Sequence, residues 1–183
     1  MRKVAILGIG QTKIDEHWDK SLKEIGGEAA FLAMQDAGID KVDALYVGNM
    51  LSSTISAQNQ LGTFFSDWIG LWKQESIKIE AACGSGAAAF RSALMAVASG
   101  DVESAMVLGV EKMTDKAGKD ITASLATAAD ADYELEQGIS FVGINALIMR
   151  RYMHEFGWKH ADFAPFSINA HANALHNPYA RLH

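Results

Sequence analysis

The residue best suited to covalent chemistry is Cys83, the only cysteine in the 183-residue sequence. It precedes the turn Gly84-Ser85-Gly86 and residues 87–98, a run that is apolar almost all the way round a helix. A cysteine at a helix N-terminus faces unpaired backbone N–H groups and the positive end of the helix dipole, and both favour the nucleophilic thiolate. The same N–H groups, that of Cys83 included, are suited to hold the oxyanion formed when a thiolate attacks a carbonyl carbon. Gly84 and Gly86 leave room for a substrate beside the sulfur.

A structural interpretation competes with this one. Cys83 would then be a small, buried apolar residue at a tight strand-to-helix turn, which is the common situation for a lone cysteine. Its placement before a helix does not by itself decide between the two interpretations.

The elements that must position Cys83 are predicted from the residues around it. Apolar and polar side chains alternate over residues 76–81, which predicts a strand. Residues 87–98 predict a helix buried on several sides, because it has no polar face. Gly100 is placed to end this helix in the left-handed conformation, and residues 105–110 form a short apolar run typical of a covered parallel strand.

The N-terminal part predicts a strand, a helix and a second strand. Residues 4–9 are predicted to be a buried strand from their length and composition. Ser21 and Glu24 form a capping-box pattern, and the helix that they open is expected to end near Gly38. Residues 44–47 form the second strand, so a right-handed crossover and a parallel pair are expected.

The remaining segments are less regular. Residues 49–72 carry aromatic side chains spaced for one helical face, interpreted as a helix on the core or as part of a subunit interface. Residues 115–137 have no hydrophobic period and are expected to be an excursion over the surface, serving as a lid or poorly ordered. Residues 138–156 predict a strong amphipathic helix that ends at Gly157, and residues 167–175 predict a last helix.

Composition limits the classes of function. With 183 residues, of which 49% are hydrophobic and 21% charged, one well-buried domain spanning residues 1–183 is expected. The net charge of −6 offers no basic stripe for nucleic acid. No segment approaches the run of about 20 apolar residues that spans a bilayer, and the N-terminus does not resemble a secretory signal. A single cysteine fits a reducing compartment, so a cytoplasmic location is expected, and the spacing of the histidines predicts no metal site.

Four stretches of the sequence resemble the N-terminal half of the thiolase family. EAACGSGAAAFRSALMAVASG (residues 80–100) and SAMVLGVEKMTD (104–115) resemble the nucleophile segment, above all that of the archaeal and sterol-carrier-protein type. There a Cys-x-Gly turn opens a buried helix, and a strand ending in G-x-E-x-M follows. VAILGIGQTK (4–13) and HANALHNPYA (171–180) resemble other parts of the same half.

The resemblance implies a fold and an activity. The fold is α/β, a mostly parallel sheet with helices on both faces, one half of the five-layer thiolase architecture. Cys83 is the residue acylated by an acyl-CoA thioester, in a carbon–carbon bond formation or thiolysis that belongs to lipid metabolism. Coenzyme A enters as a substrate carrier, so no bound cofactor and no metal are implied. His171 and Asn177 would border the substrate tunnel, and residues 76–80 would pair across the two-fold axis of a dimer.

The resemblance also implies what this sequence lacks. In the family, a histidine and a second cysteine from a C-terminal half move the protons, and the G-H-P and C-x-G motifs of that half are absent here. The chain is therefore expected to be a subunit of a split enzyme, or a truncated product, that does not turn over alone. It would form a homodimer or assemble with a chain that supplies the second half. The alternatives are a thiolase-fold condensing enzyme, a retro-aldolase subunit paired with an OB-fold/zinc-ribbon protein, or a non-catalytic assembly subunit.

Overall fold

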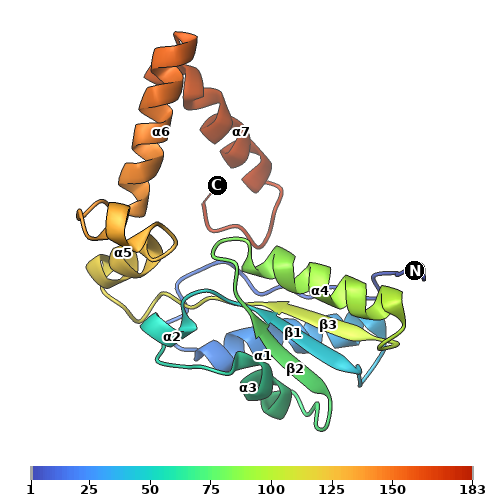
Figure 1. The fold of residues 1–183 in the computed structure, drawn as a ribbon. Coiled ribbons are helices and arrows are strands. Elements are labelled where there is room, and N and C mark those ends of the chain that lie inside the picture. The colour runs from blue at the N-terminus through green and yellow to red at the C-terminus, as the bar shows by residue number, and fades with distance from the viewer. Residues whose placement is uncertain (1, 183) are drawn as a thin grey trace. The chain divides into compact units, whose positions relative to one another are not determined.

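The computed structural model describes residues 2–182, which divide into two compact units (Figure 1). The first unit comprises the chain up to Thr12 and from Glu16 to Asp115, and it contains the strands and the predicted nucleophile. The second comprises Lys13–Asp15 and the chain from Lys116 onward, and it is helical. Each unit is described by itself.

The first unit is built on a parallel sheet. Among residues 2–182 the sheet has three strands in the order β2 (Glu75–Ile79), β1 (Ala44–Gly48) and β3 (Ala105–Gly109), and both pairs are parallel. In the register of the sheet, Gly48 lies opposite Ile79 on one side and Gly109 on the other. The carboxyl ends of the strands therefore meet at one edge, where the chain continues towards Cys83.

Helices cover both faces of this sheet (Figure 1). Helices α1 (Leu22–Ala37) and α3 (Leu61–Trp68) pack on one face and α4 (Ser85–Ser99) on the other, while α2 (Ser52–Ile55) follows β1. Every residue of β1 is buried, and its side chains alternate between the two cores. Leu45 and Val47 belong to the core under α1 and α3, whereas Ala44 and Tyr46 belong to the core under α4. The predicted α/β fold with helices on both faces is confirmed.

The short-range helix signals are present as predicted. The backbone N–H of Glu24 donates to Ser21 Oγ at 3.2 Å, and the N–H of Ser21 donates to Glu24 Oε2 at 2.7 Å, which completes the capping box of α1. Gly38 and Gly100 end α1 and α4 in the left-handed conformation, with φ of 66° and 91°.

The predicted first strand is wrong. Residues 2–14 form no helix or strand, and Ile6 and Ile9 are 70% and 74% exposed. The segment lies against α1 instead, because a Cβ added at Gly10 would lie 2.2 Å from the carbonyl oxygen of Ala29. The N–H of Ile9 also donates to Asp36 Oδ2 at 2.9 Å. None of these residues pairs with a strand of the sheet, whose described members are β2, β1 and β3.

Helix α4 is buried on one side rather than on several. Its buried residues are Ser85, Ala89, Ala93 and Ala98. Phe90, Leu94 and Met95 are 48%, 39% and 41% exposed. Within the first unit the sheet covers the alanine stripe, and the larger apolar side chains on the other sides of the helix stay partly exposed.

The second unit begins in the segment where the sequence predicts an irregular excursion. That segment contains α5 (Gly118–Ala126) and the π-helical turn η1 (Ala131–Leu135), and the extent of the domain stays a prediction. Helix α6 (Phe141–Phe156) follows, then the 3-10 turn η2 (His160–Phe163) and α7 (Ala164–Ala174).

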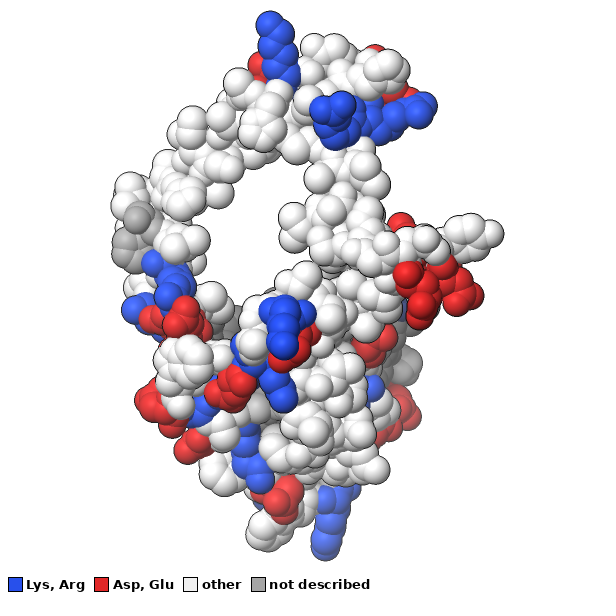
Figure 2. Space-filling view, turned by 90° about the vertical axis from the view of Figure 1, so that its left-hand side faces the viewer, with Lys and Arg blue, Asp and Glu red and all other residues white. Residues whose placement is uncertain are grey.

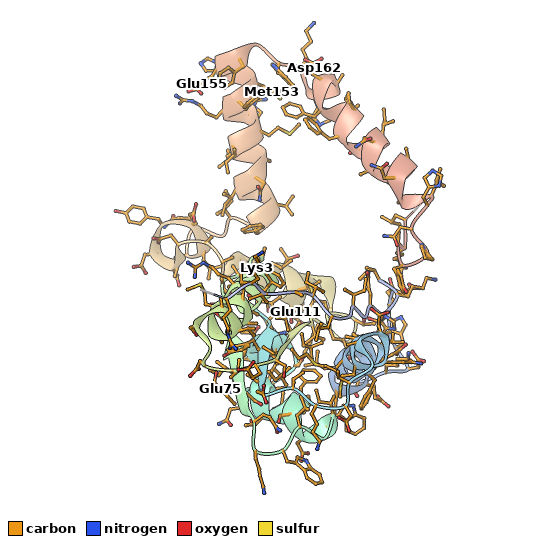
Figure 3. The ribbon with its side chains drawn as sticks, turned by 90° about the vertical axis from the view of Figure 1, so that its right-hand side faces the viewer. Lys3, Glu75, Glu111, Met153, Glu155 and Asp162 are labelled. Atoms are coloured by element: carbon orange, nitrogen blue, oxygen red, sulfur yellow. The ribbon has the colours of Figure 1, made fainter. Side chains whose placement is uncertain are left out.

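Aromatic side chains hold the connection between α6 and α7. The ring of Tyr152 lies 4.6 Å from that of Phe156 and 5.4 Å from that of Trp158, and 6.0 Å from that of Phe163. Figure 3 shows this end of the hairpin near the labelled Met153, Glu155 and Asp162. The residues of α6 are all described and none is buried, so its apolar face is not covered. Within residues 2–182, no helix combines the length and apolar character that a membrane crossing requires.

Candidate active site

The nucleophile turn joins β2 to α4. Strand β2 ends at Ile79, α4 begins at Ser85, and Cys83 lies directly before Gly84, the N-cap residue. Among the described residues, no side chain caps this helix. The N–H of Ser85 donates to the carbonyl oxygen of Ala82 at 3.1 Å, so it is the N–H groups of Gly86 and Ala87 that are left for a ligand or for water. Cys83 is exposed to solvent, and its thiol is free. This exposure does not fit the interpretation of Cys83 as a buried apolar residue.

The two glycines of the turn do not adopt the left-handed conformation with positive φ. Neither Gly84 nor Gly86 has a positive φ, whereas Ala82, the residue before the cysteine, has a φ of 47°. A Cβ added at Gly86 would meet nothing within 4 Å, so this side of the turn is open. A non-glycine residue in the left-handed region is strained, and such strain persists where the surroundings hold it in place.

A buried hydroxyl ties the turn together. Ser85 is 4% exposed, and its Oγ accepts a hydrogen bond from the N–H of Ala81 at 2.9 Å. The same hydroxyl donates to the carbonyl oxygen of Ala82 at 2.6 Å. The carboxylate of Glu80 accepts from the N–H of Ala82. The sequence analysis gave Ser85 no role, because nothing in the local sequence predicts that its hydroxyl bonds to the residues that precede it.

The end of β1 supports the start of α4. A Cβ added at Gly48 would lie 2.6 Å from the carbonyl oxygen of Ser85 and 2.7 Å from the Cα of Gly86, so strand and helix touch through backbone atoms. Only glycine fits this approach. Nothing in the local sequence distinguishes Gly48 from other strand-end glycines.

A carboxylate from the end of β3 holds the chain that leaves β1 (Figure 3). Glu111 Oε1 accepts from Asn49 Nδ2 at 2.8 Å, and Oε2 accepts from the N–H groups of Met50 and Leu51 at 3.1 Å and 3.0 Å. Asn49 is buried, and its Oδ1 accepts from the N–H of Ser52 at 3.0 Å. The G-x-E-x-M pattern contains Glu111, so the sequence marked the residue without giving its role.

Two lysines lie near the same edge. Lys112 is 8% exposed, and its ammonium group is paired with the carboxylate of Asp115. Lys78 Nζ donates to the hydroxyl of Ser52 at 3.0 Å. Both ammonium groups near the carboxyl end of β1 therefore have a partner within the chain, Asp115 for Lys112 and Ser52 for Lys78.

The other predicted site residues belong to the second unit. His171 is an exposed residue of α7, and Asn177 follows that helix. Asn177 Oδ1 accepts from the N–H of Tyr179 at 3.0 Å, which closes a local turn. The structure therefore brings Cys83, Gly84 and Gly86 together, and the tunnel role of the other two residues stays a prediction.

The described residues form no cluster of metal ligands, and the face drawn in Figure 2 carries charges of both signs. Within residues 2–182, no three His, Cys, Asp or Glu side chains converge as metal ligands would. On the face that Figure 2 shows, Lys and Arg are interspersed with Asp and Glu over the first unit.

Comparison with known proteins identifies the family. The model of the thiolase N-terminal domain matches residues 4–182. The chain is 42% identical to an acetyl-CoA acetyltransferase of Methanothermobacter thermautotrophicus over 100% of its own length and 48% of the relative's. It is 39% identical to an acetyl-CoA acetyltransferase of Methanocaldococcus jannaschii, again over 100% of its length and 46% of the relative's. The chain thus spans about half the length of these curated relatives.

A solved structure described as "Ltp2-ChsH2(DUF35) aldolase" has a similar fold. The likeness covers 96% of this chain and 44% of that chain, with a TM-score of 0.67 and 26% sequence identity. The likeness thus extends over 96% of the present chain and is not limited to the sheet.

Proposed function

Since the chain belongs to the family of thiolase N-terminal domains, we propose that it is the nucleophile-bearing part of an acyl-CoA C-acyltransferase. The observation that carries the proposal is the exposed thiol of Cys83, directly before a helix start that no described side chain caps. The acetyl-CoA acetyltransferases that it resembles support acyl-CoA as the substrate class. Coenzyme A enters and leaves with the acyl group and is not a resident cofactor.

The first half-reaction is acyl transfer to the sulfur. The thiolate of Cys83 attacks the carbonyl carbon of the thioester, a new C–S bond forms, and the C–S bond to coenzyme A breaks. The thiol proton passes to a base, and that group returns it to the departing coenzyme A thiolate. The N–H groups at the start of α4 stabilise the oxyanion of the tetrahedral intermediate.

The second half-reaction needs groups from another part of the assembly. A carbon–carbon bond forms only if a base removes the α-proton of a second acyl-CoA, and Cys83 is the single cysteine of this chain. The exposed apolar face of α4, formed by Phe90, Leu94 and Met95, is the surface on which we place a second domain. That domain belongs to a longer polypeptide or to a separate subunit.

One of the two free edges of the described sheet, that of β2, is the proposed dimer contact. Among the described strands, β2 pairs with β1 alone, and Ile77 is 44% exposed. An edge strand with unpaired backbone groups is a template for pairing with another chain. A second copy that pairs along β2 would make the dimer.

Acylation of Cys83 tests the function. The purified protein is incubated with acetyl-CoA and its intact mass is measured. We expect a mass increase of one acetyl group that hydroxylamine removes, as a thioester requires. The increase is absent in Cys83→Ala, while any background acetylation of lysine survives in both proteins and resists hydroxylamine. A wild-type chain that is never acylated, although its thiol reacts with iodoacetamide, contradicts the proposal.

A retro-aldolase subunit is the second candidate. The likeness to an aldolase complex over 96% of the chain favours it specifically. The mass experiment separates the two, because only acyl transfer requires an acyl group on Cys83. We further expect the purified single chain to show no thiolysis of acetoacetyl-CoA, which a coupled assay for acetyl-CoA would detect.

A further inference from the structure

The turn that carries Cys83 is closed by one side chain. The hydroxyl of Ser85 binds the N–H of Ala81 at 2.9 Å and the carbonyl oxygen of Ala82 at 2.6 Å. These are the two residues directly before the cysteine. Serine near a helix start usually caps the helix by accepting a bond from its own N–H groups. Ser85 bonds backwards instead, and it leaves the first turn of α4 without a side-chain cap.

The hydroxyl acts on the strained point of the turn. Ala82 has a φ of 47°, in the region that alanine rarely adopts. Its carbonyl oxygen receives both the hydroxyl and the backbone N–H of Ser85, the latter at 3.1 Å. Its N–H donates to the carboxylate of Glu80. The left-handed conformation directs the chain from β2 into α4, and these bonds keep it in place.

Ser85 is itself held in place by its contact with the end of β1. Ser85 is 4% exposed, and its carbonyl oxygen lies against Gly48, where a Cβ would come within 2.6 Å. The residues after Gly48 are held by the carboxylate of Glu111. A change at Ser85 therefore cannot be absorbed by moving the helix start, and its effect passes to the exposed side of the turn, which is Cys83.

We propose that Ser85 is a positioning residue for Cys83: its buried hydroxyl holds Ala82 in the left-handed conformation and so aims the sulfur beside the N–H groups of α4. The inference rests on the proposed acyl transfer for its consequence in catalysis. Its structural content, that the hydroxyl holds the turn, is measurable without any acyl-CoA.

The test compares Ser85→Ala with Ser92→Ala, in the protein purified with any subunit that it assembles with. Ser92 lies on the same helix, and its hydroxyl donates only to the carbonyl oxygen of Ala88, at 3.0 Å. We expect Ser85→Ala to lower the limiting rate of Cys83 acylation by about tenfold or more, with little change in the acetyl-CoA concentration that gives half the limiting rate. Alkylation by iodoacetamide at a pH where the thiol is fully ionised needs neither the oxyanion site nor the helix N-terminus, and it changes by less than about threefold. Ser92→Ala behaves as the wild type in both reactions.

Replacing the strained alanine gives a second, independent measurement. Glycine adopts a positive φ without strain, so Ala82→Gly added to Ser85→Ala restores part of the lost acylation rate. The same double variant regains the fold if Ser85→Ala alone does not fold. A double variant that acylates more slowly than Ser85→Ala, or that stays unfolded, overturns the assignment.

Hydrogen exchange separates failure of this inference from failure of the proposed function. Ser85→Ala raises the amide exchange of residues 80–84 while the middle of α4 keeps its protection. If wild-type Cys83 is never acylated but this exchange rises, the proposed function fails and the role of Ser85 in the turn stands. If the wild type is acylated and Ser85→Ala acylates at the same rate, the role of Ser85 fails and the function stands.

Discussion

The contact between Gly48 and the start of α4 predicts a large effect from one added methyl group. In Gly48→Ala the new Cβ would lie 2.6 Å from the carbonyl oxygen of Ser85, against 3.4 Å for ordinary contact, so strand and helix must separate by about 0.8 Å. All the atoms met are backbone, so no side chain can rotate away. Overpacking of this kind costs about 1–3 kcal/mol, and a rigid backbone contact places the expected loss in the upper part of that range.

The neighbouring strand offers a matched control. Gly109 is the last residue of β3 and lies opposite Gly48 in the register, yet a Cβ added there meets nothing within 4 Å. Gly109→Ala is therefore expected to change the free energy of unfolding by less than about 0.5 kcal/mol. The two variants make the same chemical change at paired positions and differ only in what the methyl group meets.

Urea unfolding measures the difference, with hydrogen exchange of the β1 peptide as the probe of the first unit. A loss of about 2–3 kcal/mol at a slope of about 1–3 kcal/mol/M lowers the midpoint by about 1–2 M urea. We also expect slower acylation of Cys83 in Gly48→Ala, because misplacement of a reacting group by about 1 Å costs about 100-fold. Equal midpoints for the two variants would refute the claim that the turn rests on Gly48.

Two further predictions concern carboxylates that hold loops. Glu111→Gln places an NH2 group against the N–H donors of Asn49, Met50 or Leu51. We therefore expect the free energy of unfolding, measured in urea, to fall by about 1–3 kcal/mol. An equal effect from Glu103→Gln, which removes a surface ion pair with Arg2, would contradict this. Bonds from the N–H and hydroxyl of Ser104 lower the pKa of Asp43, so the unfolded chain binds more protons. The stabilisation is present above about pH 4 and is lost as the pH falls through the lowered pKa; Asp43→Asn should flatten the dependence of unfolding on pH in this range.

Features that depend on neighbouring residues were predictable from the sequence. The capping box of Ser21 and Glu24 requires only a serine and a glutamate three residues apart, and both of its bonds form. Gly100 ends α4 because glycine accepts a positive φ at no steric cost. The apolar run of residues 105–110 predicted a covered parallel strand, and β3 pairs in parallel with β1, whereas the parallel pair expected between residues 4–9 and 44–47 does not form. The family resemblance named the correct half of a known fold.

Features that depend on distant contacts were not predictable. Residues 4–9 have the composition of a strand, but the segment packs against α1, through the bond from the N–H of Ile9 to Asp36 and the close approach of Gly10 to Ala29, and does not join the sheet. Helix α4 has apolar residues on every side, yet within the first unit only its alanine stripe is buried. At the site, alanine carries no signal for a positive φ, so the strain at Ala82 became visible only in the structure.

The parallel topology explains how residues far apart in the sequence act on one sulfur. Strand β2 leads into the turn of Cys83, β1 ends at Gly48 beneath the start of α4, and β3 leads to Glu111, which holds the chain leaving β1. If any one strand ran in the opposite direction, the residues that follow it would lie at the other end of the sheet. The contact of Gly48 with α4 or the bonds of Glu111 to the chain after β1 would then be lost. We propose that these three contributions together set where the sulfur of Cys83 lies. Variants at Gly48, Ser85 and Glu111 should accordingly slow the acylation of Cys83 in the mass experiment.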